Sequence, residues 1–218
     1  METISCEEVR KLCQALIRQP SLSGQEKGAS LVLQTYMKEQ GVFDTIQVDD
    51  YGNTLASIKG DRPGPVVLFD GHIDTVPVED ETAWTYPPFA GDIHGNRLYG
   101  RGASDMKGAL AAMTVGAVQF ARQTKKKFAG TLYIAAVVHE ECFEGVAARA
   151  ISQAIRPDYV IIGEASGLDL KVGQRGRAEI VLESKGKSCH SANPEKGVNA
   201  VYKMCKAIAC LQQVPAPV

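Results

Sequence analysis

The sequence predicts an α/β protein, a three-layer sandwich with a mostly parallel central sheet, followed by the start of a second α+β domain. Short apolar, β-branched stretches of strand length alternate with longer segments whose apolar residues recur at helical spacing. Polar or acidic side chains repeatedly stand directly after the apolar stretches. That placement is typical of the carboxyl edge of a parallel sheet, where binding residues gather.

The first helix carries the clearest local signal. Ser5 as N-cap with Glu8 three residues later forms a capping box, and the helix is expected to end before Pro20. Spacing and turn residues predict the elements that follow, which are a helix between 26 and 41, a hairpin of strands 46–48 and 54–58, a turn at 62–65, a strand at 66–69, a long loop at 76–89, a helix at 106–123, a strand at 131–138, a helix at 146–155 and a strand at 159–162.

The pattern changes near Gly173. Alternating apolar and charged residues at 178–183 predict a half-exposed strand, and apolar residues at helical spacing follow at 201–211. One strand and one helix cannot make a stable domain alone, because each needs a second layer to cover its apolar face. We therefore expect a catalytic domain at 1–173 and the beginning of a lid or dimerisation domain, truncated, at 174–218.

Composition limits the possible partners. A formal net charge of −1 gives no field that would attract nucleic acid or an anionic membrane. The start of the chain shows no hydrophobic segment of the kind that signal peptides contain, so none is expected, and the longest apolar runs are too short to cross a bilayer. Six cysteines occur without any C-x-x-C motif. These features predict a reduced, cytoplasmic protein.

The strongest chemical signal follows the apolar stretch 66–69. His72 and Asp74 lie on the same side of an extended segment, since successive side chains alternate. Asp74 can then hold one ring nitrogen of His72 while the other binds a metal ion. A surface or capping Asp beside an unrelated His is the structural alternative.

Further acidic residues follow later apolar stretches. Glu140 and Glu141 come after 131–138, so one carboxylate can bind metal while the other acts as a base. Paired Glu is common on protein surfaces, but here the pair follows an apolar strand. With Glu164 and Asp105, the set offers one imidazole and several carboxylates without a Cys motif. That donor set suits one or two divalent ions that promote hydrolysis.

These motifs together resemble a known superfamily. The segments that carry the resemblance are 71–77, 100–108, 140–141 and 163–164. Their order and separations resemble the di-zinc amidohydrolase/peptidase superfamily, which includes acetylornithine deacetylase, succinyl-diaminopimelate desuccinylase, aminoacylase-1 and the bacterial glutamate carboxypeptidase. The stretch 173–200 is similar to one branch in particular, the selenium-metabolism-linked hydrolases.

The resemblance implies two Zn²⁺ ions per complete active site, with Co²⁺ or Mn²⁺ as substitutes. It also implies a cis peptide bond between Asp105 and Met106. The implied roles are His72 and Glu164 on the first zinc, Glu141 on the second, Asp105 bridging both, Asp74 orienting His72, and Glu140 as the general base.

The lid domain has its own implied role. By resemblance it forms a homodimer, and His190 reaches into the active site of the partner subunit to stabilise the developing oxyanion. The family has one more zinc-binding His beyond the lid, and no position of this sequence matches it. His94 stands in a turn sequence and is expected at the surface, and His139 is expected on the strand face opposite Glu140.

The predicted function is zinc-dependent hydrolysis of an amide bond in a small N-acyl amino acid or short peptide, with Arg175 or Arg177 as candidates for recognising a carboxylate. The alternative is a truncated, non-catalytic metal-binding fragment, or a subunit completed by another chain. A cysteine hydrolase built on Cys189 and His190 is disfavoured, because neighbouring strand residues face opposite ways and no orienting acid is evident.

Overall fold

The computed structural model describes residues 5–143 and 145–215. The chain forms two compact units, Met1–Leu170 and Lys171–Val218. The elements of the first unit are α1 (Cys6–Ile17), α2 (Lys27–Gln40), β1 (Thr45–Val48), β2 (Thr54–Lys59), β3 (Arg62–His72), the short turn η1 (Glu81–Ala83), β4 (Asp92–His94), β5 (Arg97–Tyr99), the short segment η2 (Ala103–Lys107), α3 (Gly108–Thr124), β6 (Ala129–Val137), α4 (Val146–Ile155) and β7 (Tyr159–Ile162).

A five-stranded sheet in the order β1-β2-β6-β3-β7 forms the middle of the first unit. Strand β3 pairs in parallel with β6 on one side and with β7 on the other. Strand β2 pairs antiparallel with both β1 and β6, so within this sheet it alone runs against the other four strands. The predicted mostly parallel sheet is confirmed.

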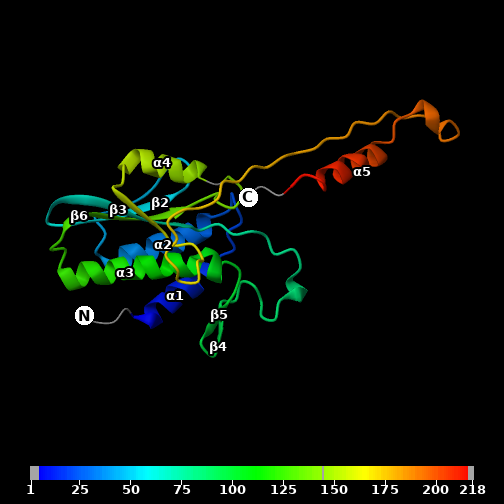
Figure 1. Cartoon of the computed structure of the whole chain (residues 1–218). Helices are drawn as coiled ribbons and strands as arrows, with labels where there is room; N and C mark the ends of the chain where they lie inside the picture. The colour runs from blue at the N-terminus through cyan, green and yellow to red at the C-terminus, as the bar shows by residue number, and fades with distance from the viewer. Residues whose placement is uncertain (1–4, 144, 216–218) are drawn as a thin grey trace. The chain divides into compact units, whose positions relative to one another are not determined.

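Helices cover both faces of this sheet. Figure 1 shows α1 and α3 on one face and α4 on the other, which is the predicted three-layer arrangement. The core between the layers is aliphatic, and its fully buried side chains include Leu16, Leu33, Leu110 and Ile134. Their burial stabilises the fold because about 25 cal/mol is gained for each Å² of apolar surface removed from water.

The helix ends follow the capping signals. Ser5 is the N-cap of α1, and its hydroxyl accepts a hydrogen bond from the backbone N–H of Glu8 at 3.3 Å. The carboxylate of Glu8 accepts from the hydroxyl of Tyr36 on α2 at 2.7 Å, which ties the first two helices together. Helix α2 ends at Gly41, which adopts the left-handed conformation (φ 67°) that terminates helices.

Two sequence predictions about local structure were wrong. Residues 62–65 are not a separate turn but the start of β3, where the register against β6 shifts between Arg62 and Val66. Residues 178–183 do not form a strand. In the described part of the second unit the strand-like pairing is a single antiparallel bridge between Lys187 and Val198. An alternating pattern is not enough to form a strand when no neighbouring strand is there to pair with it.

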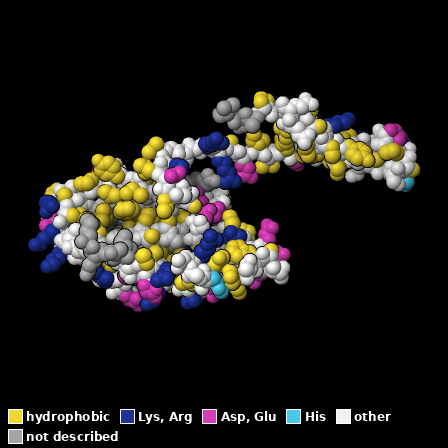
Figure 2. Space-filling model, turned by 60° about the horizontal axis from the view of Figure 1, so that its bottom comes forward, with side chains coloured by type: hydrophobic (Ala, Val, Ile, Leu, Met, Phe, Trp, Pro, Cys, Tyr) yellow, Lys and Arg dark blue, Asp and Glu magenta, His cyan; other side chains and the backbone are white. Residues whose placement is uncertain are grey.

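The second unit contains the short turn η3 (Pro194–Lys196) and α5 (Ala200–Leu211), capped by Asn199. The predicted helix at 201–211 is confirmed. Its apolar side chains are largely exposed, including Val201, Tyr202 and Leu211, and Figure 2 shows hydrophobic side chains on the surface of this unit. Nowhere in the described ranges does a helix combine the length and hydropathy that crossing a bilayer requires.

Candidate metal centre

The sheet topology gathers the acidic residues at one edge. Strands β3, β6 and β7 are parallel neighbours, so their carboxyl ends meet at the same side of the sheet. His72 is the last residue of β3, Glu140 and Glu141 lie in the turn after β6, and Glu164 follows β7. The sequence expectation that these residues come together at one edge agrees with the structure.

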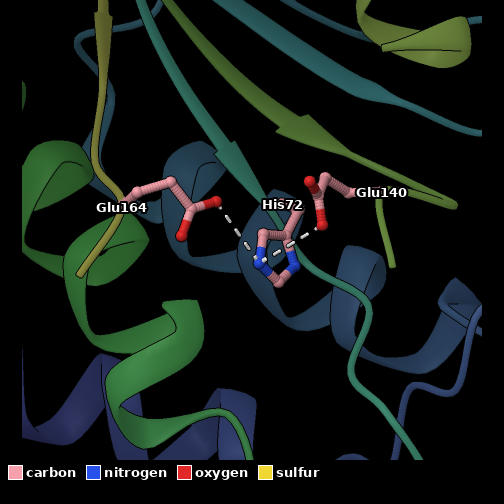
Figure 3. Close-up of side chains that lie close together, drawn as sticks. All are labelled: His72, Glu140 and Glu164. Carbon is pink, nitrogen blue, oxygen red and sulfur yellow. Dashed lines mark ion pairs between the residues drawn. The ribbon is translucent and has the colours of Figure 1, made fainter. Parts of the chain in front are cut away.

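His72 stands at the centre of the cluster and is 2% exposed. Its Nε2 atom lies 2.9 Å from Oδ1 of Asp105, 3.6 Å from Oε1 of Glu164 and 4.0 Å from Oε2 of Glu140. In Figure 3, Glu140 and Glu164 approach the ring from opposite sides. One imidazole nitrogen and three carboxylates thus converge on a small volume.

Two groups of side chains within the described residues can each hold a metal ion. The first is His72, Glu140 and Glu164, and the second is His72, Asp105 and Glu141. In each group one potential ligand atom per residue lies within 4.8 Å of the others. This grouping differs from the assignment implied by the resemblance, in which Asp105 and Glu164 share the first ion. The individual roles therefore stay predictions.

Asp105 is presented by a short irregular segment. Met106, the next residue, is fully buried, whereas the side chain of Asp105 is 61% exposed and free to reach a ligand. The peptide bond between the two is cis, as the resemblance predicts. Gly102, at the start of the segment, has φ 82°, a conformation that favours glycine.

Asp74 is completely buried behind His72. Nδ1 of His72 lies 2.9 Å from the backbone oxygen of Asp74 and 3.6 Å from its Oδ1, so the shorter contact is with the backbone. The carboxylate of Asp74 accepts from the Ser23 hydroxyl at 2.6 Å and from the backbone N–H groups of Glu140 and Glu141 at 3.2 and 3.1 Å. Asp74 therefore contacts both His72 and the paired glutamates.

The charges of the cluster favour a bound cation. Burial alone would lower the pKa of His72, but the carboxylates of Asp74, Asp105 and Glu164 raise it to about 10. Burial, together with the neighbouring carboxylates, also raises the pKa values of the carboxyl groups of Glu140, Glu141 and Glu164. A cluster that takes up protons to relieve its negative charge, with one imidazole and several carboxylates as donors, fits a divalent metal ion.

Two buried ionisable residues at this edge had no role predicted from the sequence. Lys107 is completely buried, and its ammonium group donates to the backbone oxygens of Leu16 and Gln19, at 3.0 and 2.9 Å, near the end of α1. Burial lowers the pKa of Lys107 to about 8. Glu26 is 6% exposed and contacts the turn after β6. The hydrogen bonds of both residues join segments that are far apart in the sequence, so local sequence patterns do not predict them.

The remaining histidines lie away from the cluster centre. His94 is exposed and stacks on Tyr86 at 3.8 Å between ring centroids, as expected for a surface residue. His139 is not on a strand face opposite Glu140, because β6 ends at Val137 and His139 lies in the following turn with φ 59°. His190 belongs to the second unit, where it is exposed and accepts from the backbone N–H of Ala192.

The chain is similar to known proteins over most of its length. A model of peptidase family M20/M25/M40 matches residues 68–216. Uncharacterized protein YgeY of Escherichia coli (strain K12) is 32% identical over 209 residues, which cover 95% of this chain and 51% of that protein. A succinyl-diaminopimelate desuccinylase of Beijerinckia indica is 34% identical over 220 residues, which cover 94% of this chain and 57% of that protein.

A solved structure shares the fold. The M20 family metallo-carboxypeptidase Sso-CP2 from Sulfolobus solfataricus superposes with a TM-score of 0.65 at 22% identity, covering 94% of this chain and 49% of that chain. The chain thus spans about half the length of the curated relatives that it matches.

Proposed function

The chain belongs to peptidase family M20/M25/M40, and from this premise we propose that it carries the metal-binding part of a metal-dependent amide hydrolase. The observation that carries the proposal is the convergence of His72, Asp105, Glu140, Glu141 and Glu164 on one edge of the sheet. Metal ions held there would polarise a carbonyl group and activate a water molecule.

We assign the ligands as the family resemblance implies. His72 and Glu164 would hold a first zinc ion, Glu141 would hold a second, and Asp105 would contribute to both. All of these residues contribute to the two potential ligand groups. The mixture of one imidazole with carboxylates is the support for zinc, and Co²⁺ or Mn²⁺ can replace it.

Glu140 acts as the general base in this proposal. Its carboxyl lies 4.0 Å from His72, and burial raises its pKa above the usual value for Glu. A raised pKa suits a group that takes a proton from the attacking water and then passes it to the leaving amine. Asp74 orients His72 and, through the backbone, the turn that carries Glu140.

The proposed substrate is a small N-acyl amino acid or a short peptide. The support is the similarity to a succinyl-diaminopimelate desuccinylase. Arg175 or Arg177 recognises a substrate carboxylate, and His190 acts across a homodimer formed through the second unit. A reduced, cytoplasmic location completes the proposal, supported by six free cysteines.

Amine release from a panel of N-acyl amino acids and dipeptides tests this function. The native protein loaded with zinc should hydrolyse at least one member, and Glu140→Gln should remove most turnover while metal content stays unchanged. Zinc-loaded protein without turnover on any member, or an active Glu140→Gln variant, would contradict it.

A second candidate is metal binding without turnover by this chain alone. It is favoured by the span of the chain, which is about half that of its relatives. Activity that appears only when a second polypeptide is added would identify this case.

A further inference from the structure

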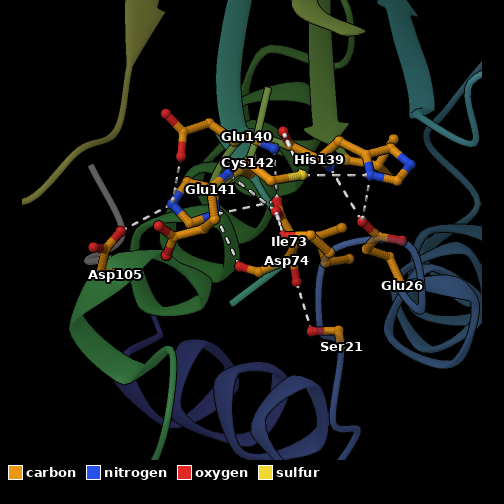
Figure 4. A network of polar contacts seen from close by, with 12 residues as sticks. Ser21, Glu26, Ile73, Asp74, Asp105, His139, Glu140, Glu141 and Cys142 are labelled. Carbon is orange, nitrogen blue, oxygen red and sulfur yellow. Dashed lines mark hydrogen bonds and ion pairs between the residues drawn. The ribbon is translucent and has the colours of Figure 1, made fainter. Parts of the chain in front are cut away.

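The backbone of the turn after β6 is held in place by hydrogen bonds to side chains from other segments. Three successive N–H groups donate to buried carboxylates. His139 donates to Oε1 of Glu26 at 3.1 Å, Glu140 to Oδ1 of Asp74 at 3.2 Å, and Glu141 to Oδ2 of Asp74 at 3.1 Å. Figure 4 shows these contacts, with Glu26 and Asp74 approaching the turn from different segments. The orientation of Glu140 and Glu141 thus depends on two acidic residues outside the turn.

Glu26 is fixed in place on its own side. It directly precedes α2, and its Oε1 also accepts from the backbone N–H of Gly24 at 2.8 Å. Its side chain is 7% exposed, so water can replace few of these contacts. A carboxylate near the N-terminus of a helix is stabilised by the positive end of the helix dipole. Glu26 is therefore a fixed acceptor and not a mobile surface group.

The turn needs such an acceptor. His139 has φ 59°, a left-handed conformation that residues with a Cβ rarely adopt, so the turn does not hold its shape by local preference. A hydrogen bond to an ionised carboxylate is about twice as strong as one between neutral groups. The bond to Glu26 stabilises the backbone immediately before Glu140, 113 residues away in sequence.

We propose that Glu26 is a positioning residue for the metal centre. It holds the N–H of His139 so that the next two residues present their carboxyl groups toward His72. This inference rests on the proposed function, in which Glu141 binds metal and Glu140 is the base. Glu26 itself is not one of the candidate ligand residues.

Zinc affinity of four variants tests the proposal. Glu26→Ala removes the acceptor and should weaken binding of the second zinc ion, the one that Glu141 holds, on the order of 10-fold to 100-fold, the usual effect of losing an outer hydrogen-bond partner of a metal site. Glu26→Gln keeps an acceptor oxygen and should stay closer to the parent. Ser30→Ala is the matched control, because it removes a buried hydrogen bond to Thr54 from the same helix without touching the turn. Glu141→Gln tests the underlying ligand assignment.

The outcomes distinguish a failure of the proposed function from a failure of the inference about Glu26. If Glu141→Gln binds the second zinc ion like the parent, the proposed function fails regardless of Glu26. If Glu141→Gln weakens binding but Glu26→Ala does not, the inference about Glu26 is wrong. Equal loss in Ser30→Ala and Glu26→Ala, or in the Gln and Ala variants of Glu26, would also overturn it.

Amide hydrogen exchange provides a readout that does not depend on the Ala variant folding. In the parent protein the N–H of His139 should exchange slowly, since it is bonded to a buried carboxylate. The same N–H should remain slow in Glu26→Gln and in Ser30→Ala. Fast exchange of His139 in the parent protein would contradict the proposal.

Discussion

Asp74→Ala should destabilise the metal-free protein strongly. The carboxylate is completely buried and accepts three hydrogen bonds, from Ser23 and from the N–H groups of Glu140 and Glu141. A hydrogen bond to a charged group contributes about 1.5–3 kcal/mol, and leaving a buried donor unpaired costs about 1–3 kcal/mol. Since the turn can relax partly toward water, we expect a loss of about 3–5 kcal/mol in the free energy of unfolding.

The pH dependence of this loss identifies the charged carboxylate as its source. Burial would raise the pKa of Asp74, but the neighbouring His72 ring and the hydrogen bonds from Ser23 and the two backbone N–H groups lower it below the usual value. A lowered pKa in the folded state means that the stabilisation is present above the unfolded value of about 3.9 and is lost as pH falls through the folded value. The difference between parent and variant should be constant between about pH 5 and 7 and shrink in more acidic solution.

Urea unfolding in the presence of EDTA measures the loss without contribution from metal. Asp44→Ala is the control, because Asp44 also accepts a backbone N–H, from Lys59, and pairs with Lys126, but lies at the exposed surface. Its loss should stay within about 1 kcal/mol. A loss below about 1 kcal/mol for Asp74→Ala, or one that vanishes already at pH 6, would refute the reasoning.

Three further predictions concern the same edge of the sheet. In the complete enzyme, Glu140→Gln should keep both bound metal ions, whereas Glu141→Gln should lose affinity for the second, and equal metal contents in the two variants would show that their roles are assigned wrongly. Zinc must displace the proton that the pKa of about 10 keeps on His72, so zinc affinity should rise about tenfold per pH unit from pH 6 to 8, and a flat titration would contradict this. Lys107→Met leaves two backbone oxygens without their donor and should lower the free energy of unfolding by about 2–4 kcal/mol; unchanged urea unfolding would argue against it.

The predictions of helix ends, which depend on local capping signals, agreed well with the structure. Ser5 and Gly41 mark the helix ends because capping involves residues only a few positions apart. The segment 62–65 was predicted to be a turn, since it holds Pro63 and Gly64. Pairing with β6 instead makes it the start of β3, with a register shift between Arg62 and Val66. The residues 178–183 show the opposite case, in which an alternating pattern has no partner strand among the residues that the structure describes.

The site was predictable to the level of which residues meet. Side chains that follow parallel strands must approach one another, so His72, Glu141 and Glu164 could be placed together from sequence. Which of these residues share one metal ion could not be predicted, because it depends on side-chain conformations and on the negative charge that the carboxylates share. The roles of Glu26 and Lys107 depend on hydrogen bonds to residues 113 and 91 positions away, for which a single sequence holds no local signal.

Counting the zinc ions bound to the 218-residue chain tests the central claim most directly. The proposed first site has three ligands, His72, Asp105 and Glu164, whereas the second has only Asp105 and Glu141, without the imidazole that favours zinc. We therefore expect at most one tightly bound zinc ion per chain after dialysis, and none in His72→Ala. Two tightly bound zinc ions per chain with substantial turnover, or a His72→Ala variant that binds zinc as tightly as the parent, would contradict this account of the metal centre.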